Sequence, residues 1–420
     1  AERISKLFIE KQLKIYGPGR YFYSVDLFNE MSPNTVDVGQ TFRAAAKPVI
    51  DADPHAVLVV QMWCFAHDSM AWTPDRVTQF MRSVSPDRVI YLDLHGDKRP
   101  QWKRLERVLT RSDQLVWTLL HNFGGTKGMA GALKHIRHQI ELALHSKNGI
   151  RGLGISMEGI EQNEILYQFV LDQAWDDFEN DQWLQQWINA RYQVQGNIFF
   201  PAWECALSTV YNRPFHLDGW GNTKSIIEER PARDMARDKF QPTVFEYNAQ
   251  EFRRCVQMFV SAMHQTETGE LQSILYDGVD FVRQTISDEA FSNKENIQLL
   301  IEDVADILET HWMWKTTMDD VDWDSLNDDE IRDFRLLFTY WSKHTEYLHS
   351  YSSRFSADIV KQVYLPRWAS WLKGIRHKDS NIEDAWIASE VIKYPAKPNI
   401  NFTGFLKLAD SFFIKVNNRD

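Results

Sequence analysis

Long apolar runs and an excess of basic residues are both missing from this chain of 420 residues. No uninterrupted apolar stretch reaches the ~18 residues that a membrane-spanning helix needs. The net charge is −11, whereas nucleic acids and anionic membranes are bound by basic faces. These absences predict a protein that binds neither nucleic acid nor membrane.

Cysteine is also scarce, with Cys64, Cys205 and Cys255 as its three occurrences. Three cysteines cannot all pair within one chain, and none lies in a CxxC array or near a ligand-spaced histidine. The pattern favours buried thiols over a disulfide framework or a metal site. The histidines include no HExxH pair, and no serine stands in a GxSxG elbow. Neither metal-dependent nor serine hydrolysis is indicated.

The composition that is present is that of a globular protein, with 44% hydrophobic and 25% charged residues. The length exceeds the roughly 100 to 200 residues of an average domain, so two domains are expected. The first residue is Ala1, which indicates a processed chain or a fragment. One sequon, Asn401-Phe402-Thr403, would matter only in a secretory route.

Short apolar runs recur at intervals of roughly 30 residues in the first part of the chain, as expected for buried parallel strands. They are Tyr21–Glu30, Ala56–Phe65, Arg88–His95, Leu115–His121 and Ile150–Glu158. Helical signals lie between them, for example the N-cap and first turn Thr73-Pro74-Asp75. Repeated strand and helix units predict either an open doubly wound sheet or a (β/α)8 barrel, and five strands underfill a barrel of eight.

From about Asn163 onward the apolar spacing becomes helical, which predicts an all-α second domain. The expected helices are Asn163–Trp175, Trp183–Val194, Ala249–His264, Gly269–Ile286, Asn296–Trp312, Asp328–Tyr351 and Ser356–Ile375. Most of the 16 tryptophans lie on these apolar stripes and are expected to pack in the core.

Two glutamates close the first and the last predicted strand, Glu30 and Glu158. In β/α enzymes the carboxyl ends of the strands carry the chemistry. A pair of carboxylates there is what cleavage of a glycosidic bond requires. The other strand ends carry amides, acids and aromatics, which fit a sugar better than a phosphate. They are Asn29, Gln61, Trp63, Asp93, Leu94, His121, Asn122 and Phe123.

The motifs around these residues resemble the α-N-acetylglucosaminidases of glycoside hydrolase family 89. The resemblance runs along almost the whole chain and is carried by segments in family order. They are Asp26-Leu27-Phe28-Asn29-Glu30-Met31, Gln61-Met62-Trp63, Leu92-Asp93-Leu94, Leu120-His121-Asn122-Phe123-Gly124-Gly125, Met157-Glu158-Gly159-Ile160, Gln162-Asn163-Glu164, Val210-Tyr211-Asn212 and Tyr364-Leu365-Pro366-Arg367-Trp368.

The resemblance implies an α/β fold with two domains. Residues 1–178 would form the C-terminal portion of a (β/α)8 barrel, with about five of its strands, and residues 179–420 would form an all-α domain that contributes to the pocket. It implies a retaining exo-enzyme that releases terminal α-linked N-acetylglucosamine without a cofactor, with Glu30 as acid/base and Glu158 as nucleophile. Heparan sulfate is the substrate of the lysosomal relatives. A lysosomal or secreted location follows from the same resemblance, and a homo-oligomer stays open.

Substrate contacts are implied at further positions that match the family's pocket. These are Asn29, Trp63, Leu94, Phe123, Trp341, Leu348, Tyr351 and His216. The segment after Trp341 departs from the family pattern, and Trp220 competes with His216 for one contact. Two alternatives stay open: a carbohydrate-binding remnant in which the missing half-barrel abolishes turnover, and an unrelated five-strand doubly wound domain.

Overall fold

The computed structural model describes residues 2–19, 21–121, 128–147, 150–158, 163–175, 180–213, 225–228, 231, 246–266, 272–315, 327–339, 355–373, 382, 385–386, 388–389 and 401–418. The chain divides into two compact units. The first unit comprises Ala1–His121, Lys134–Met157 and Ile165–Asp176. The second comprises Asn122–Leu133, Glu158–Glu164 and Asp177–Asp420. The segments that follow the fourth and fifth strands therefore cluster with the helical part of the chain.

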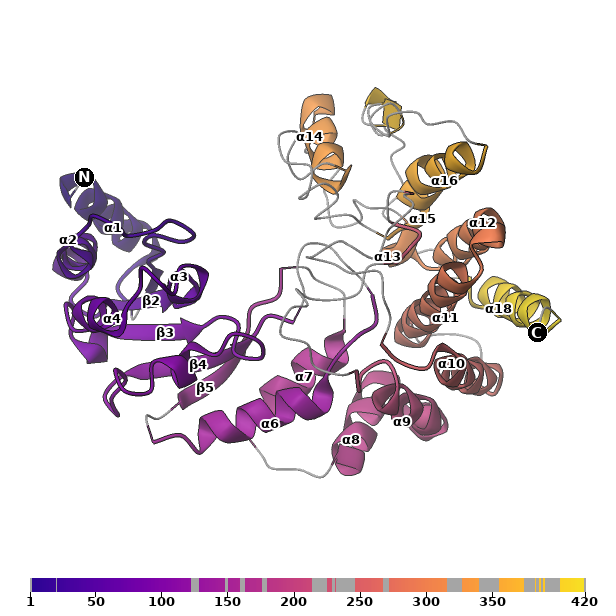
Figure 1. The fold of residues 1–420 in the computed structure, drawn as a ribbon, viewed down its shortest axis with the longest axis horizontal. Coiled ribbons are helices and arrows are strands. Elements are labelled where there is room, and N and C mark those ends of the chain that lie inside the picture. Colours follow the sequence, from indigo (N-terminus) through magenta and orange to yellow (C-terminus); the bar gives the residue numbers. More distant parts are fainter. Residues whose placement is uncertain are drawn as a thin grey trace. The chain divides into compact units, whose positions relative to one another are not determined.

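Five parallel strands form the sheet of the first unit, in the order β1-β2-β3-β4-β5 (Figure 1). Their bounds are β1 Phe22–Ser24, β2 Val57–Gln61, β3 Val89–Asp93, β4 Gln114–Leu119 and β5 Ile150–Ile155. Each strand pairs in parallel with the next along the chain, which confirms the repeated strand and helix units. Every predicted strand exists, but each ends before the last residue predicted for it.

Helices connect these strands in the first unit. They are α1 Glu2–Tyr16, α2 Val38–Ala52, α3 Trp63–His67, α4 Pro74–Met81, α5 Gln101–Arg104, α6 Leu133–Leu144 and α7 Glu164–Asp172, with a 3-10 turn at Pro86–Arg88. The predicted start of α4 is confirmed, because the Thr73 hydroxyl accepts the Arg76 N–H at 3.4 Å. The core beneath α2 and α4 is aromatic, with the Phe42 and Phe80 rings stacked at 4.3 Å. We did not predict α1 or α2.

The second unit is helical in its described residues from Asn180 onward (Figure 1). Its longer helices are α8 Asn180–Tyr192, α9 Phe200–Ser208, α10 Ala249–His264, α11 Gln272–Ser292, α12 Ile297–Leu308, α14 Asp328–Thr339, α16 Leu365–Leu372 and α18 Phe402–Asn417. Shorter helical segments are η2 Gln193–Phe199, η4 Lys294–Asn296, α13 Trp312–Lys315, α15 Ala357–Ile359 and the π-helical turn Val360–Tyr364. The helix α10 has the predicted bounds. Trp183, Trp314 and Trp368 are buried, as the apolar stripes predicted.

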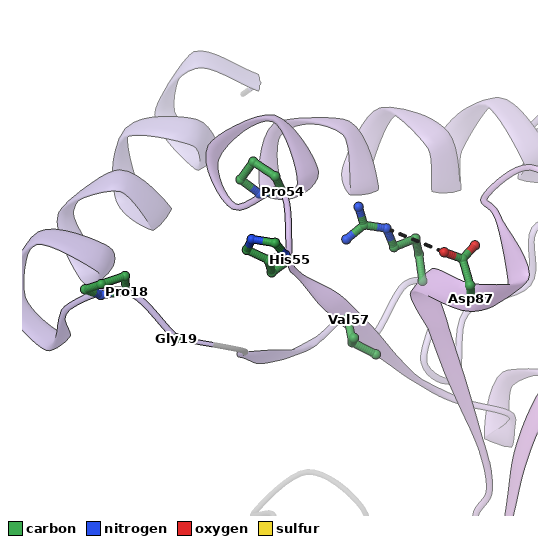
Figure 2. Close-up of a pocket in the computed structure, with 7 residues that line it drawn as sticks. Pro18, Gly19, Pro54, His55, Val57 and Asp87 are labelled. Atoms are coloured by element: carbon green, nitrogen blue, oxygen red, sulfur yellow. Dashed lines mark ion pairs between the residues drawn. The ribbon is translucent and has the colours of Figure 1, made fainter.

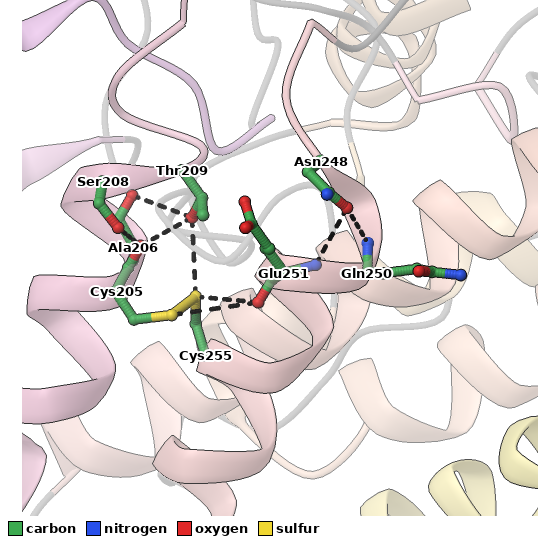
Figure 3. Close-up of a disulfide and its surroundings, with 8 residues drawn as sticks. All are labelled: Cys205, Ala206, Ser208, Thr209, Asn248, Gln250, Glu251 and Cys255. Carbon is green, nitrogen blue, oxygen red and sulfur yellow. Dashed lines mark hydrogen bonds between the residues drawn. A yellow bond between two sulfur atoms is a disulfide. The ribbon is translucent and has the colours of Figure 1, made fainter.

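The prediction for the cysteines is wrong for two of the three. Cys205 on α9 and Cys255 on α10 form a disulfide, with their Cα atoms 5.3 Å apart (Figure 3). Cys64 is a free, buried thiol. Fifty residues separate the paired cysteines, so the packing of α9 against α10, which no local pattern reports, decides the pairing. In the described part of the chain, no helix has both the length and the apolarity to span a bilayer.

Candidate active site

The carboxyl ends of the parallel strands meet at one edge of the sheet, and that edge gathers the predicted residues of the first unit. Asn29 and Glu30 follow β1, Trp63 follows β2 and Leu94 follows β3. Glu158 lies three positions beyond the end of β5 and is assigned to the second unit, where its side chain is exposed. The predicted residues Phe123, His216, Trp341, Leu348 and Tyr351 lie outside the described residues.

The structure brings Glu30 and Trp63 together. The Trp63 indole N–H donates to Glu30 Oε1 at 3.0 Å. His67, one helical turn beyond Trp63 on α3, places Nδ1 4.0 Å from the same oxygen. The Glu30 side chain is 60% exposed, so it can reach a ligand while Trp63 restrains it. A carboxylate held in this way can exchange a proton with a bound molecule.

The backbone that presents Glu30 is strained. Phe28 and Asn29 have φ angles of 73° and 36°, in the left-handed region that bulky residues such as Phe rarely adopt. The Phe28 ring lies edge-on to the buried Trp72 ring at 5.3 Å, and this packing opposes relaxation of the loop. His121, two residues after the end of β4, is also left-handed, with φ 67°. Such strain, of about 1–3 kcal/mol per residue, concentrates at functional sites.

Leu94 lies at the end of β3 between two buried polar residues, Asp93 and His95. Its carbonyl oxygen accepts a hydrogen bond from the Ser156 hydroxyl at 2.9 Å, which ties the ends of β3 and β5 together. The preceding Asp93 is fully buried and accepts the Trp102 N–H at 2.8 Å, and burial raises the pKa of Asp93 to about 7. Asp93 therefore holds the start of α5 and is not presented to a ligand.

Sequence reasoning missed two histidines near Trp63. The His67 ring lies 6.3 Å from the Trp63 ring, and the buried His95 ring lies 6.1 Å from it. His95 Nε2 is 3.5 Å from the buried Asp97 carboxylate, and burial lowers the pKa of His95. The spacing of four residues between Trp63 and His67 could have indicated that His67 lies near Trp63, because it places both residues on one face of a helix.

A cleft of about 530 Å³ lies at the opposite edge of the sheet (Figure 2). It is bordered by Pro18, Gly19, Pro54, His55, Val57, Asp87 and Arg88. Its one acid, Asp87, lies 3.9 Å from Arg88. The cleft is therefore remote from Glu30 and has no carboxylate pair. Within the described residues, no group of three or more His, Cys, Asp or Glu is arranged to hold a metal ion.

Comparison with known proteins identifies the family. The family model described as the alpha-N-acetylglucosaminidase (NAGLU) tim-barrel domain matches residues 2–177, and that of the NAGLU C-terminal domain matches residues 183–323. Human alpha-N-acetylglucosaminidase (Homo sapiens) is 25% identical over 461 residues, which cover 98% of this chain and 60% of the human protein.

Solved structures share the fold. A family 89 glycoside hydrolase from Clostridium perfringens, in complex with 2-acetamido-1,2-dideoxynojirmycin, has a TM-score of 0.82 at 23% identity. A variant of the Clostridium perfringens enzyme with two glutamates changed to glutamine, in complex with its substrate GlcNAc-alpha-1,4-galactose, has a TM-score of 0.81 at 23% identity. Each comparison covers 98% of this chain and 50% of the other.

These matches confirm the predicted architecture, in which part of a TIM barrel precedes a helical domain. They also show that this chain spans 60% of the human relative and half of each bacterial structure. Since the two matching models describe consecutive domains of one enzyme and run from residue 2 to residue 323, the chain belongs to the alpha-N-acetylglucosaminidase family, glycoside hydrolase family 89.

Proposed function

We propose that this chain is a retaining exo-glycoside hydrolase that releases terminal α-linked N-acetylglucosamine. The observation that carries the proposal is the hydrogen bond from Trp63 to Glu30 at the carboxyl edge of the sheet. Family membership supports it, as does the bacterial relative, whose form with two glutamates replaced is described as bound to its substrate. Heparan sulfate is the natural glycan that we propose, by analogy with the lysosomal relatives.

In the proposed mechanism, the Glu158 carboxylate attacks the anomeric carbon while Glu30 protonates the glycosidic oxygen. The carbon–oxygen bond breaks, the leaving sugar departs as an alcohol, and an ester joins the sugar to Glu158. Glu30 then takes a proton from water, whose oxygen displaces Glu158 from the anomeric carbon. Two displacements return the original α configuration, and only these two carboxyl groups are needed for the chemistry.

Trp63 determines which oxygen of Glu30 carries the proton. An indole N–H can only donate, so Glu30 Oε1 must be an acceptor in both steps. We therefore assign the proton of the neutral acid to Oε2, the oxygen to which the indole does not donate. Asn29, Leu94 and Trp63 are proposed to contact the sugar from the first unit. We propose that Phe123, His216, Trp341, Leu348 and Tyr351 also contact the sugar. We further propose that residues 1–178 form one domain and residues 179–420 the other.

The roles of the two glutamates can be tested with azide rescue. The intact chain is expected to release nitrophenol from a nitrophenyl α-N-acetylglucosaminide and to yield the α-anomer first, as monitored by NMR. In Glu158→Ala, azide would enter on the face vacated by the carboxylate and give the β-glycosyl azide. In Glu30→Ala, azide would replace water and give the α-glycosyl azide. Glu141→Ala, at an exposed position on α6, is the matched control.

An initial β-anomer, or full activity in Glu158→Ala, would contradict the mechanism. The second candidate function is carbohydrate binding without turnover. It predicts no nitrophenol release by the intact chain but retained binding of N-acetylglucosamine in calorimetry.

For the compartment, we propose lysosomal or secreted maturation. The Cys205–Cys255 disulfide supports an oxidising compartment, and the sequon residue Asn401 is exposed. After expression through a eukaryotic secretory route, a glycosidase that removes N-linked glycans should increase the electrophoretic mobility of the parent chain but not of Asn401→Gln. Asn418→Gln, at an exposed asparagine outside a sequon, should behave like the parent. An unchanged parent mobility would contradict glycosylation at Asn401.

A further inference from the structure

The segment that follows β4 is hydrogen-bonded to the helical part of the second unit along its described length. Gly131 N donates to the Val210 carbonyl at 3.1 Å, and the Gly131 carbonyl accepts Arg213 N at 3.0 Å. Leu133 N donates to the Tyr211 carbonyl at 2.9 Å. The connection between β4 and α6 is thus held by the residues that follow α9.

Asn163 joins this segment to the one that carries Glu158. Its Oδ1 accepts Ala130 N at 3.0 Å, and its Nδ2 donates to the Gly128 carbonyl at 3.0 Å. The Asn163 side chain is 2% exposed, and its φ of 51° is left-handed. Asparagine tolerates this conformation better than most residues. Five positions after Glu158, the chain is therefore fixed to the segment that follows β4.

Gln284 on α11 fixes the same segment from the helical side. Its Oε1 accepts Met129 N at 3.0 Å, and its Nε2 donates to the Tyr247 hydroxyl at 3.0 Å and to Asp288 Oδ1 at 3.1 Å. Tyr247 in turn donates to both Asp288 oxygens at 2.8 Å. These partners leave a single orientation for the Gln284 amide, because its oxygen must accept and its nitrogen must donate.

We propose that Asn163 and Gln284 are positioning residues that set the Glu158 segment and the segment after β4 against α11. The proposal rests on the proposed function, since it assigns these residues to the placement of the nucleophile. Neither side chain is proposed to touch the substrate. They act through the backbone of Gly128, Met129 and Ala130, so that a helix of the second unit controls two segments that follow strands of the sheet.

Two variants remove these bonds with little other change. Asn163→Gly keeps the left-handed conformation, which glycine adopts readily, and loses both side-chain hydrogen bonds. Gln284→Met keeps the length of the side chain and loses the amide. The matched controls are Gln193→Gly, at an exposed residue with φ 55°, and Gln298→Met, at an exposed position on α12.

Hydrogen exchange and kinetics test the proposal together. Backbone exchange in the peptide spanning residues 128–133 is expected to accelerate about tenfold in each variant, the size expected for one lost buried hydrogen bond. The kcat is expected to fall about 100-fold, as for a small misplacement of a reacting group, with KM changed less than threefold. The two controls should match the parent in both measurements.

The outcomes separate this proposal from the proposed function. If the parent is active and a variant shows faster exchange but the same kcat as the parent, the positioning role is overturned. Unchanged exchange in both variants overturns it as well, whether or not the parent is active. If the parent is inactive, the proposed function is refuted, and so is the role of Glu158 as the nucleophile that these residues are proposed to place. Faster exchange in the variants would in that case still establish the link between the two segments.

Discussion

The Trp63 indole N–H donates a 3.0 Å hydrogen bond to Glu30 Oε1 and thereby joins the loops that follow β1 and β2. Two residues from separate motifs, 33 positions apart, thus form one unit at the sheet edge. The bond gives Glu30 a defined orientation, although most of its side chain is exposed.

Trp63→Phe should impair the proposed acid step, because it keeps a ring at the position but removes the donor. A hydrogen bond to a charged group contributes about 1.5–3 kcal/mol, so kcat/KM is expected to fall about 10- to 100-fold. Measurement with a poor and a good leaving group should show the larger loss for the poor one, which needs protonation more. Trp175→Phe, at an 89% exposed position, is the control. Equal losses for both leaving groups would argue against a role in proton donation.

The buried Asp288 predicts a pH-dependent difference in stability. Burial raises its pKa to about 7, above the ordinary value of about 3.9. Since the folded-state pKa is raised, this carboxyl contributes stability that is fully present below about pH 4 and is lost as the pH rises through about 7. Relative to the parent, Asp288→Asn should therefore gain stability from pH 5 to about pH 7, by up to about 1.4 kcal/mol per pH unit, and the gain should level off above that pH.

Urea unfolding at pH 5, 6, 7 and 8 would measure this difference. Comparison with the parent cancels the opposing contribution of buried histidines such as His311, whose pKa is lowered to about 4 by burial. The control is Asp333→Asn, which makes the same substitution at an exposed position on α14. A difference for Asp288→Asn that stays constant across this range would mean that the carboxyl is already charged in the folded chain.

Gly404 is required by the cap of α18. The Asn401 side chain accepts Gly404 N at 2.9 Å, and a Cβ at position 404 would lie 2.2 Å from Asn401 Nδ2. Gly404→Ala should therefore displace the cap and destabilise the chain by about 1 kcal/mol, similar to Asn401→Ala. Thermal unfolding of both single variants and of the double variant tests this coupling. Additive losses in the double variant would show that the two residues act independently.

The disulfide between α9 and α10 should stabilise the chain measurably. Replacing Cys205 and Cys255 by serine is expected to lower the free energy of unfolding by about 2–4 kcal/mol, because the bond restricts the unfolded chain. Thiol titration of the parent should detect one thiol after denaturation, and that thiol, Cys64, is buried when folded. Detection of three thiols in a non-reducing denaturant would contradict the pairing.

Local patterns in the sequence were sufficient for the framework. Apolar runs predicted the five parallel strands, and Thr73-Pro74 predicted the start of α4, because strand burial and helix capping depend on residues close together in the chain. The strands were predicted to extend further toward their carboxyl ends than they do. The left-handed backbone at Phe28 and Asn29 cannot continue a strand, and packing of Phe28 on Trp72 maintains it.

The placement of Glu30 and Glu158 beyond the first and the last strand was determined by the sequence itself, since motif order along the chain sets which strand each follows. Tertiary structure alone decided that Trp63 and His67 lie beside Glu30, that Cys205 pairs with Cys255, and that Asn163 and Gln284 hold the segment after β4. Each of these contacts joins residues far apart in sequence, so it exists only once packing has brought their backbones within reach of a hydrogen bond, an ion pair or a disulfide.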